Sequence, residues 1–460
     1  MTSRSKAALL ALAAVIIALG MRTAAAAGPS SCAGDKPGMA NPAALYCQEL
    51  GYGYRTVKGA QGQYGICALP DGSECDEWGF LEGTCGQAYS YCARQGLNMI
   101  TKTDGKNSLT PDYAVCVSGQ QPMGAVTDLM RLSEKATTGS QPAPNTAAPN
   151  LNSSTAGLPA SFDWRNKDGK DWMTPVKNQG ICGSCWAFSA VGVAEAMYNI
   201  EHNNPDLDLD LSEEYLVSDC YSGESGCCGG DPGDALGSIK SSGIPGESCL
   251  QYVDGGADGC ACSGDGTCDS SQCTYSVGAC SDTTCSDRCS DWQTRLVKVS
   301  ANHLIPPARI KDELVAGGPL SAVMGIGGAY GGHFDGDTYR CDDDSDSNHA
   351  VVIVGYDDTG GYWIVKNSWG ASWGPGGDGY FKVGYGECAI ESYVHGYAPD
   401  LSVGGIAEAP DANASPLGAT ASGGSSPPPY APIAGAAAAG VIVLAAGGWC
   451  VRRRYSVRRR

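Results

Sequence analysis

A chain of 460 residues has room for about two or three domains, and its 42% of hydrophobic residues is enough to build globular cores. Glycine, at 65 residues, and proline, at 25, are more frequent than in an average domain and require many turns and linkers. The formal charge of −19 at pH 7 argues against a nucleic-acid partner, because an acidic surface repels phosphates.

Residues 1–27 have the features of a secretion signal. Arg4 and Lys6 precede an apolar run from Ala7 to Gly20, which is followed by small residues over Ala24–Ala27. A charged start, an apolar centre and a small-residue cleavage site are typical of a signal peptide. The alternative, a transmembrane anchor, is disfavoured because the run is short for crossing a bilayer. We therefore expect an exported protein of the secretory pathway.

Residues 431–451 are a candidate membrane anchor. They carry no charge and, at about 20 residues, are long enough to span a bilayer. Residues 452–460 contain six arginines, and a basic cluster directly after an apolar segment is typical of a cytoplasmic tail. We expect a single-pass membrane protein at the cell surface or in a lumen. A sorting tail that is removed after export is the alternative.

Cysteine usage points to an oxidising compartment. Of 23 cysteines, Cys450 lies in the terminal apolar segment, and the other 22 fall in dense clusters across the region expected to be exported. This density favours structural disulfides outside the cytosol. Zinc sites are the alternative for clustered cysteines, but the redox argument favours disulfides, so we expect no metal.

Four regions lie between the two apolar ends. Residues 28–119 form a small module with seven cysteines, and residues 120–157 are a Pro-, Ala- and Thr-rich linker or pro-segment. Residues 158–400 alternate helix-like and strand-like runs, as a folded enzyme does. Residues 401–430 are a second linker, which ends in three consecutive prolines.

Within residues 158–400, a helix precedes several strands. Cys185–Ile200 is an Ala-rich apolar run that predicts a buried helix, with Ser184 as its candidate N-cap. Ala350–Gly355 and Tyr362–Lys366 are β-branched or aromatic runs bounded by Gly and Asn, which predict strands. A helix followed by a sheet indicates an α+β fold with two unlike halves.

The stretch Asn178–Phe188 contains Cys-Gly-Ser-Cys-Trp, a pentamer that occurs around the nucleophile of papain and cathepsins. Its second cysteine, Cys185, opens the predicted helix, where free N–H groups and the helix dipole favour a thiolate. His349 precedes a predicted strand in Ser-Asn-His-Ala-Val-Val-Ile-Val and can project into a cleft. Asn367, in Trp-Ile-Val-Lys-Asn-Ser-Trp-Gly, can accept a hydrogen bond from that imidazole, and Trp369 can shield the bond from water.

These motifs resemble the papain family of cysteine proteases over residues 158–400. The resemblance implies a two-lobed fold, with a helical lobe and a β-barrel-like lobe, and a cysteine-type endopeptidase that acts on polypeptides without a cofactor. In that match Cys185 is the nucleophile, His349 the base and then the acid, and Asn367 the residue that orients it. Gln179 would donate its amide to the oxyanion hole beside the backbone N–H of Cys185. A catalytically silent adhesion or binding protein and a peptide ligase are the alternatives, but all catalytic-type residues are present.

Gly226–Pro232, with the sequence Gly-Cys-Cys-Gly-Gly-Asp-Pro, resembles the family stretch that lines the substrate cleft. In that match Gly229 and Gly230 offer their backbone to an extended peptide, which side chains there would block. The other substrate-binding residues that the resemblance implies are Asp231, Pro232, Val323, Ala350, Tyr393 and Trp369. Asp231 stands where the family often has an apolar group, so a preference for a basic side chain in S2 and a solvent-facing carboxylate stay equally open.

Cysteine pairs also follow from the resemblance. The implied disulfides are Cys182–Cys227, Cys341–Cys388 and a bond from Cys220 to a cysteine near Cys260. Cys228 competes for the first of these bonds. Residues 249–290 depart from the family because they hold eight cysteines and no histidine. The histidine-bearing insertion that makes some family members carboxydipeptidases therefore cannot be carried over.

An acidic loop, Asp342–Asp346, approaches His349 along the chain. Its spacing lacks the EF-hand pattern, so we interpret it as a solvated loop and not as a calcium site. We expect its charge to stabilise the His349 imidazolium at long range, more strongly at low salt.

Three stretches near the N-terminus resemble a small domain family of unknown function that carries a haemolysin-type label. They are Asn41–Cys47, Tyr64–Gly72 and Cys75–Phe80. The label does not predict haemolysis. No helical propeptide of the kind found in papain-like zymogens is visible before residue 158, so an inhibitory pro-region and a retained binding module both stay open. The cleavable linker favours the first role, and the disulfide density slightly favours the second.

Overall fold

The structure, a computed structural model, describes residues 36–139, 141–142, 157–207, 209–221, 226–253, 262–263, 267–268, 284–299 and 302–396. These residues all belong to one compact unit. The predicted signal (residues 1–27), membrane segment (residues 431–451) and basic tail (residues 452–460) lie outside them. Within the described ranges, no helix combines the length and the apolar character needed to cross a bilayer.

The N-terminal module extends over residues 36–139, so that residues 120–139, expected to be part of the linker, are folded with it. It consists of short helices and two antiparallel sheets of three strands, β2-β3-β4 and β5-β6-β7. Its elements are β1 (Gly38–Met39), α2 (Pro42–Glu49), β2 (Gly53–Lys58), β3 (Gln63–Ala68), β4 (Glu74–Asp76), α3 (Glu77–Glu82), α4 (Tyr91–Arg94), β5 (Asn98–Lys102), β6 (Tyr113–Ser118), β7 (Gln121–Ala125), α5 (Val126–Leu129), α6 (Leu132–Ala136) and β8 (Thr137–Gly139). Asn41 caps α2, because its side chain accepts hydrogen bonds from the N–H groups of Ala43 and Ala44. The disulfides described in the module are Cys47–Cys67, Cys75–Cys85 and Cys92–Cys116.

The main domain, residues 157–396, is organised around helix α7 (Cys185–Glu201), which confirms the helix predicted at Cys185–Ile200. Every residue of α7 except the last two is buried, and small side chains allow such packing on all sides. Ser189 Oγ ties the helix to the sheet, 2.7 Å from Ser321 Oγ and 2.6 Å from the carbonyl oxygen of Val351. Helix α7, which Cys185 begins, is therefore fixed to the sheet by hydrogen bonds as well as by apolar contact.

Ser184 stands at the N-cap position of α7, but its side chain makes no capping bond. Its hydroxyl lies 2.7 Å from the hydroxyl of Tyr252. The predicted cap was wrong in this respect, because a tertiary contact takes the hydroxyl away from the helix.

A mixed sheet packs against α7, in the order β13-β21-β14-β18-β19-β20-β16-β15, with β10 also paired to β18. Its strands are β10 (Ser161–Asp163), β13 (His303–Leu304), β14 (Leu320–Met324), β15 (His333–Asp335), β16 (Thr338–Arg340), β18 (His349–Asp357), β19 (Tyr362–Lys366), β20 (Tyr380–Gly384) and β21 (Val394–Gly396). The predicted strands Ala350–Gly355 and Tyr362–Lys366 are confirmed in β18 and β19. Among the described residues the edge strands β13 and β15 do not pair, so the sheet does not close into a full barrel. The predicted α+β fold, with a helical half and a β-rich half, is confirmed.

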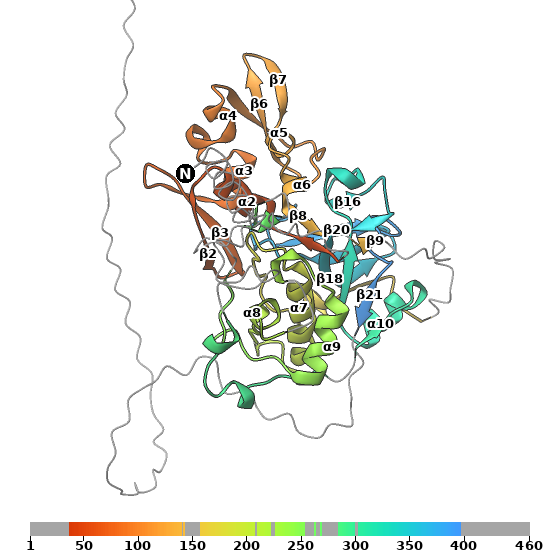
Figure 1. Cartoon of the computed structure of the whole chain (residues 1–460). Helices are drawn as coiled ribbons and strands as arrows, with labels where there is room; N and C mark the ends of the chain where they lie inside the picture. The colour runs from red at the N-terminus through yellow and green to blue at the C-terminus, as the bar shows by residue number, and fades with distance from the viewer. Residues whose placement is uncertain are drawn as a thin grey trace, which may run out of the picture. The chain divides into compact units, whose positions relative to one another are not determined.

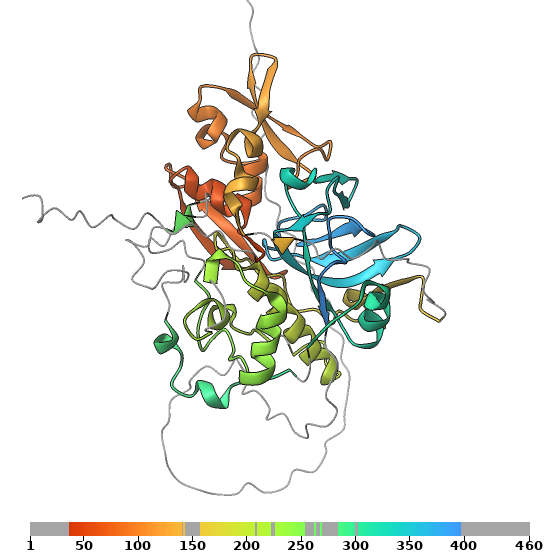
Figure 2. The ribbon, with the colours of Figure 1, turned by 45° about the vertical axis from the view of Figure 1, so that its right-hand side comes forward.

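The remaining described elements surround this core. They are α8 (Glu213–Val217), α9 (Pro232–Ser242), α10 (Ile310–Ala316) and the pairs β11 (Cys262–Ser263) with β12 (Thr267–Cys268) and β9 (Gln141–Pro142) with β17 (Asp346–Ser347). Both views show α7 and α9 side by side, in green, next to the blue strands of the sheet (Figure 1, Figure 2).

The described part of the main domain contains the disulfides Cys182–Cys227, Cys220–Cys285, Cys249–Cys289 and Cys341–Cys388. The expected bond from Cys220 to a cysteine near Cys260 was wrong. The Cys249–Cys289 bond closes the insertion at its base, which brings the nearby Cys285 to Cys220. Cys228 also takes part in a disulfide, and Cys185 is free.

Candidate active site

The first residue of α7 is the candidate nucleophile, and it is closed off from solvent. Cys185 and His349 are both 0% exposed. Burial raises the pKa of the Cys185 thiol to about 11, and the backbone N–H groups of Met39 and Ala350, which face the sulfur, oppose this only in part. Since Ala350 directly follows His349, the thiol lies at the start of β18, the strand that the candidate base begins. In this closed arrangement the sulfur keeps its proton at neutral pH.

Adjacent strand ends bring the candidate base and its partner together. His349 begins β18, and Asn367 directly follows the last residue of the neighbouring strand β19. His349 Nε2 lies 2.8 Å from Asn367 Oδ1. The ring of Trp369 covers this pair, with its centroid 4.6 Å from that of His349. Among the described residues the other ring nitrogen, Nδ1, has no hydrogen-bond partner, which leaves it available for proton transfer.

The His349 ring is neutral at pH 7 in this arrangement. Burial lowers its pKa to about 4, and the hydrogen bond with Asn367 raises it only in part. The acidic loop Asp342–Asp346 does not offset this fall in the pKa of His349, and its expected long-range effect on the imidazolium stays a prediction.

Gln179 is oriented by bonds at both ends of its amide. Its Oε1 accepts a hydrogen bond from Ser368 Oγ at 2.7 Å. Its Nε2 donates to the carbonyl oxygens of Cys182 and Met39, each at 2.8 Å. The amide group therefore already contacts a peptide carbonyl beside the candidate nucleophile.

That carbonyl belongs to a segment whose position sequence reasoning missed. Residues 36–41 cross the site, and β1 pairs with β8, with Gly38 opposite Gly139 and Met39 opposite Thr137. Met39 is fully buried. The nearest sequence signal, Asn41 followed by proline, marks the start of a helix. It carries no information about where the preceding residues lie.

The glycines predicted to bind substrate lie against this same segment. Gly230 N donates to the carbonyl oxygen of Pro37 at 3.1 Å. A Cβ on Gly229 would lie 3.0 Å from that oxygen, so the close approach depends on glycine there. Val323 and Ala350, also predicted for the pocket, are buried and directly opposite each other in β14 and β18.

Asp231 and its neighbours are part of the fold at the start of α9. Asp231 Oδ1 accepts from the N–H groups of Gly233 at 2.7 Å and Asp234 at 3.1 Å, and Pro232 occupies the first turn. Its other oxygen, Oδ2, accepts from the Tyr393 hydroxyl at 2.7 Å. Both carboxylate oxygens are therefore bonded within the protein, which disfavours the solvent-facing alternative.

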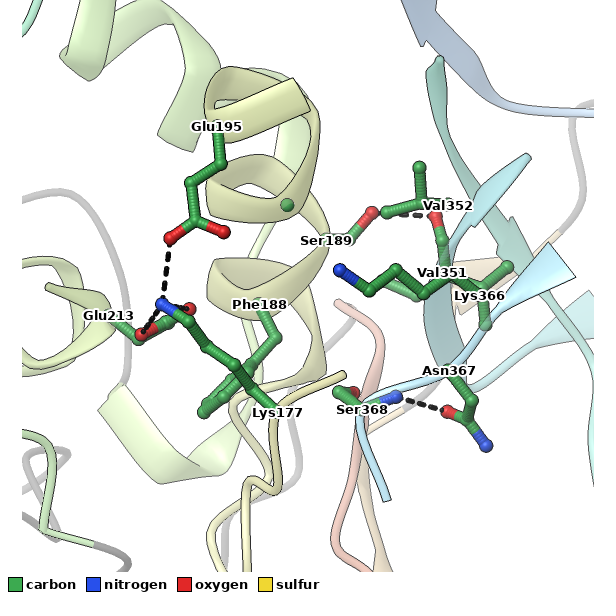
Figure 3. Close-up of a pocket in the computed structure, with 12 residues that line it drawn as sticks. Lys177, Phe188, Ser189, Glu195, Glu213, Val351, Val352, Lys366, Asn367 and Ser368 are labelled. Atoms are coloured by element: carbon green, nitrogen blue, oxygen red, sulfur yellow. Dashed lines mark hydrogen bonds and ion pairs between the residues drawn. The ribbon is translucent and has the colours of Figure 1, made fainter. Parts of the chain in front are cut away.

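A polar pocket that sequence reasoning missed lies beside Asn367, between α7 and the sheet (Figure 3). Lys177 Nζ forms ion pairs there with Glu195 at 2.8 Å, Asp210 at 2.8 Å and Glu213 at 3.0 Å. Burial lowers the pKa of Lys177, but these three carboxylates, together with that of Glu247, overcome this and hold the pKa well above its usual range. The charges come from separate stretches of sequence, so no local pattern identifies them as a cluster.

Comparison with known proteins identifies the domain that carries the site. The profile described as "Papain family cysteine protease" matches residues 158–398. The chain belongs to the papain family. A second profile, "Domain of unknown function (DUF333)", matches residues 38–84 in the N-terminal module.

Curated relatives of this papain-family chain include viral and plant proteases. A viral cathepsin of Cydia pomonella granulosis virus is 36% identical over 230 residues, which cover 49% of this chain and 57% of the relative. Vignain of Vigna mungo is 34% identical over 236 residues, which cover 49% of this chain and 54% of the relative. The chain thus spans little more than half the length of these relatives. A solved structure of procathepsin L2 from Tenebrio molitor larval midgut is 30% identical, with a TM-score of 0.40, and the match covers 53% of this chain and 70% of that one.

Proposed function

We propose that this papain-family chain is a cysteine endopeptidase that hydrolyses polypeptides with Cys185 as its nucleophile. The observation that carries the proposal is the convergence of four side chains from separate stretches of sequence. The sulfur of Cys185 faces the N–H of Ala350, the residue after His349, and the His349 ring is bonded to Asn367 at 2.8 Å. The Gln179 amide contacts a peptide carbonyl at the same place.

Hydrolysis proceeds as two acyl transfers. His349 takes the proton of Cys185, and the first N–H groups of α7 favour the thiolate once the cleft is open. The thiolate adds to the substrate carbonyl, and Gln179 Nε2 and the backbone N–H of Cys185 hold the oxyanion. His349 then protonates the leaving amine, and water hydrolyses the thioester with the same groups in reversed roles. Asn367 keeps the imidazole ring oriented throughout.

The substrate lies extended against Gly229 and Gly230, and the side chain that fills the S2 pocket lies near Asp231. Because both Asp231 oxygens are already bonded, the carboxylate contributes negative charge to the pocket wall while staying in place. This arrangement favours a basic or polar side chain in S2. The histidine-free insertion at residues 249–290 argues for endopeptidase and against carboxydipeptidase action.

The enzyme acts outside the cytosol. The disulfides of both the module and the main domain persist only in an oxidising compartment. A signal at residues 1–27 and a single-pass anchor at residues 431–451, followed by a basic cytoplasmic tail, complete the proposed topology.

Active-site labelling tests the proposal. Residues 28–430 are incubated for hours with a peptidyl epoxide that alkylates cysteine nucleophiles, because local opening must expose the buried thiol. We expect label on Cys185 and slow hydrolysis of an unfolded polypeptide, and we expect both to be lost in Cys185→Ala. Equal hydrolysis by wild type and Cys185→Ala would contradict the proposed nucleophile.

A further inference from the structure

The segment that crosses the active site lies there as a peptide substrate would. Met39 O accepts a hydrogen bond from Gln179 Nε2 at 2.8 Å, and the Met39 N–H faces the sulfur of Cys185. Two residues earlier, Pro37 O accepts from Gly230 N at 3.1 Å, on the side proposed for the acyl half of a substrate. The chain therefore enters from the acyl side and brings the Met39 carbonyl to the thiol.

The other half of the segment is anchored on the leaving-group side. Ala40 N donates to the carbonyl oxygen of Ala136 at 2.9 Å, and Asn41 N donates to that of Gly180 at 2.8 Å. Asn41 Nδ2 also donates to the carbonyl oxygen of Trp369 at 3.4 Å. Each residue that follows the Met39 carbonyl is thus held in place before α2 begins.

We propose that the N-terminal module, residues 36–139, is a built-in inhibitor of this cysteine-protease cleft, which it closes in the orientation of a substrate. The bond that it presents to Cys185 is Met39–Ala40. The inference rests on the proposed peptidase function and gives a role to the domain of unknown function that matches residues 38–84.

The Met39–Ala40 peptide bond stays intact because its leaving group, the Ala40 amine, cannot diffuse away. Attack by Cys185 would form a thioester at Met39, break the bond to Ala40 and transfer the sulfur proton through His349 to the Ala40 nitrogen. That amine stays bonded to Ala136 O and continues into the anchored helix α2. Held beside the thioester at a high effective concentration, it re-forms the peptide bond and returns the proton before water enters.

The module also contacts the main domain through residues outside the segment 36–41. Trp78 Nε1 donates to the carbonyl oxygen of Trp369 at 2.9 Å, and the two rings stack with centroids 6.0 Å apart. Trp373 Nε1 donates to the carbonyl oxygen of Leu109 at 3.0 Å. These tryptophan contacts hold the module on the leaving-group side, so the segment is positioned by a folded domain.

Gly38 is the position at which the segment can be displaced without changing a catalytic residue. A Cβ there would lie 2.7 Å from the backbone Cα of Gly229 and 2.5 Å from Thr138 Oγ1. Gly38→Ala therefore forces the segment away from the cleft. A Cβ on Gly53, in β2 of the same module, would lie at an ordinary 3.6 Å from Ala68 Cβ, so Gly53→Ala is the matched control.

The experiment compares epoxide labelling of Cys185 and peptide hydrolysis in wild-type, Gly38→Ala and Gly53→Ala forms of residues 28–430. We expect Gly38→Ala to react at least about tenfold faster, because a larger fraction of molecules has an open cleft. Gly53→Ala should react like wild type. Equal and measurable rates for wild type and Gly38→Ala would overturn the inhibitor while leaving the peptidase intact. If none of the three forms reacts, the peptidase function fails and the inhibitor fails with it.

A second variant keeps the test decisive if Gly38→Ala does not fold. Thr138→Val removes the 2.9 Å hydrogen bond from Thr138 Oγ1 to Gly38 O with little change in shape, and should also speed labelling. A folded Thr138→Val protein that labels at the wild-type rate would overturn the proposal. Mass spectrometry of wild type should find the Met39–Ala40 bond intact. Complete cleavage there with a gain of activity would instead identify a disposable pro-region.

Discussion

Gln179 has two roles at the scale of single residues, because the amide proposed to hold the oxyanion also holds the inhibitory segment. With the segment displaced by Gly38→Ala, Gln179→Ala should lower kcat by about 10²–10³ and change KM little, since one oxyanion donor is lost. Steady-state kinetics on a peptide substrate measures both constants.

A smaller change to the same group provides the control for Gln179. Ser368→Ala removes the hydroxyl that bonds Gln179 Oε1 at 2.7 Å but leaves the donor itself in place. Its kcat should therefore fall less than that of Gln179→Ala. An unchanged kcat in Gln179→Ala would exclude its proposed role.

Lys177 is important for stability because it neutralises buried carboxylates beside the active site. Lys177→Met would leave Glu195 and Glu213 buried without their cation, which should lower the free energy of unfolding by about 3–5 kcal/mol. Denaturant unfolding measures the loss. Lys240→Met, at an exposed position of α9, should change stability little. Similar small losses in both variants would show that the cluster is not charged as described.

Asn41 connects two functions at the scale of elements, since it caps α2 and anchors the segment that precedes it. Asn41→Ala should lower the free energy of unfolding by about 0.5–2 kcal/mol through loss of the cap. It should also speed epoxide labelling of Cys185, because the bond from Asn41 Nδ2 to Trp369 O is lost.

Another cap in the same module separates these two effects. Ser90 caps α4 by accepting from Ala93 N at 3.2 Å, and no bond of its side chain reaches the cleft. Ser90→Ala should therefore cost similar stability without faster labelling. If both variants label at the same rate, the Asn41 contacts do not control access to the thiol.

In the candidate site, the pairing of strands decides which residues come together, and their separation along the chain does not. His349 and Asn367 meet because β18 and β19 are neighbours and both residues lie at the same end of the pair. Cys185 lies near this end because α7 packs on β18, with Ser189 bonded to Val351 O and the Cys185 sulfur facing the N–H of Ala350. Local periodicity predicts each of these elements, but their adjacency depends on the packing of the whole sheet.

At the scale of the whole molecule, Glu77 lies where the module packs against the main domain and makes the free energy of unfolding depend on pH. Its carboxylate oxygens accept from Tyr54 at 2.8 Å, from Asn178 at 2.7 Å and from Gly65 N at 3.2 Å. Burial nevertheless raises the pKa of Glu77 to about 8, from an ordinary value of 4.5, and the neighbouring Asp76 adds to the rise. The folded protein therefore holds a proton that the unfolded chain releases above pH 4.5.

The free energy of unfolding should consequently fall as pH rises from 4.5 to 8 and then level off. The contribution of Glu77 has a slope of at most about 1.4 kcal/mol per pH unit. Glu77→Gln, which mimics the protonated carboxyl, should lack this contribution. Melting temperatures of both forms between pH 5 and 8.5 measure the difference, since other titrating groups are shared. Parallel curves for the two forms would rule out Glu77 as the source.

The sequence by itself determined the elements that carry the candidate catalytic residues, and it singled out Cys185 as the proposed nucleophile. A cysteine motif directly before an Ala-rich run predicts both Cys185 and its helix, and β-branched runs predict β18 and β19, because these signals lie within a few consecutive residues. The resemblance then supplied the roles of His349, Asn367 and Gln179, which stay proposals for experiment.

Only the tertiary structure decided what occupies the cleft. Met39 and Gln179 are 140 positions apart, and their bond uses a backbone carbonyl, which every residue type possesses. The same reason applies to the Ser184 hydroxyl, the Asp231 carboxylate and the partner of Cys220, whose bonds join distant parts of the chain. Local sequence specifies which groups are present, whereas the packing of module against domain decides which of them meet.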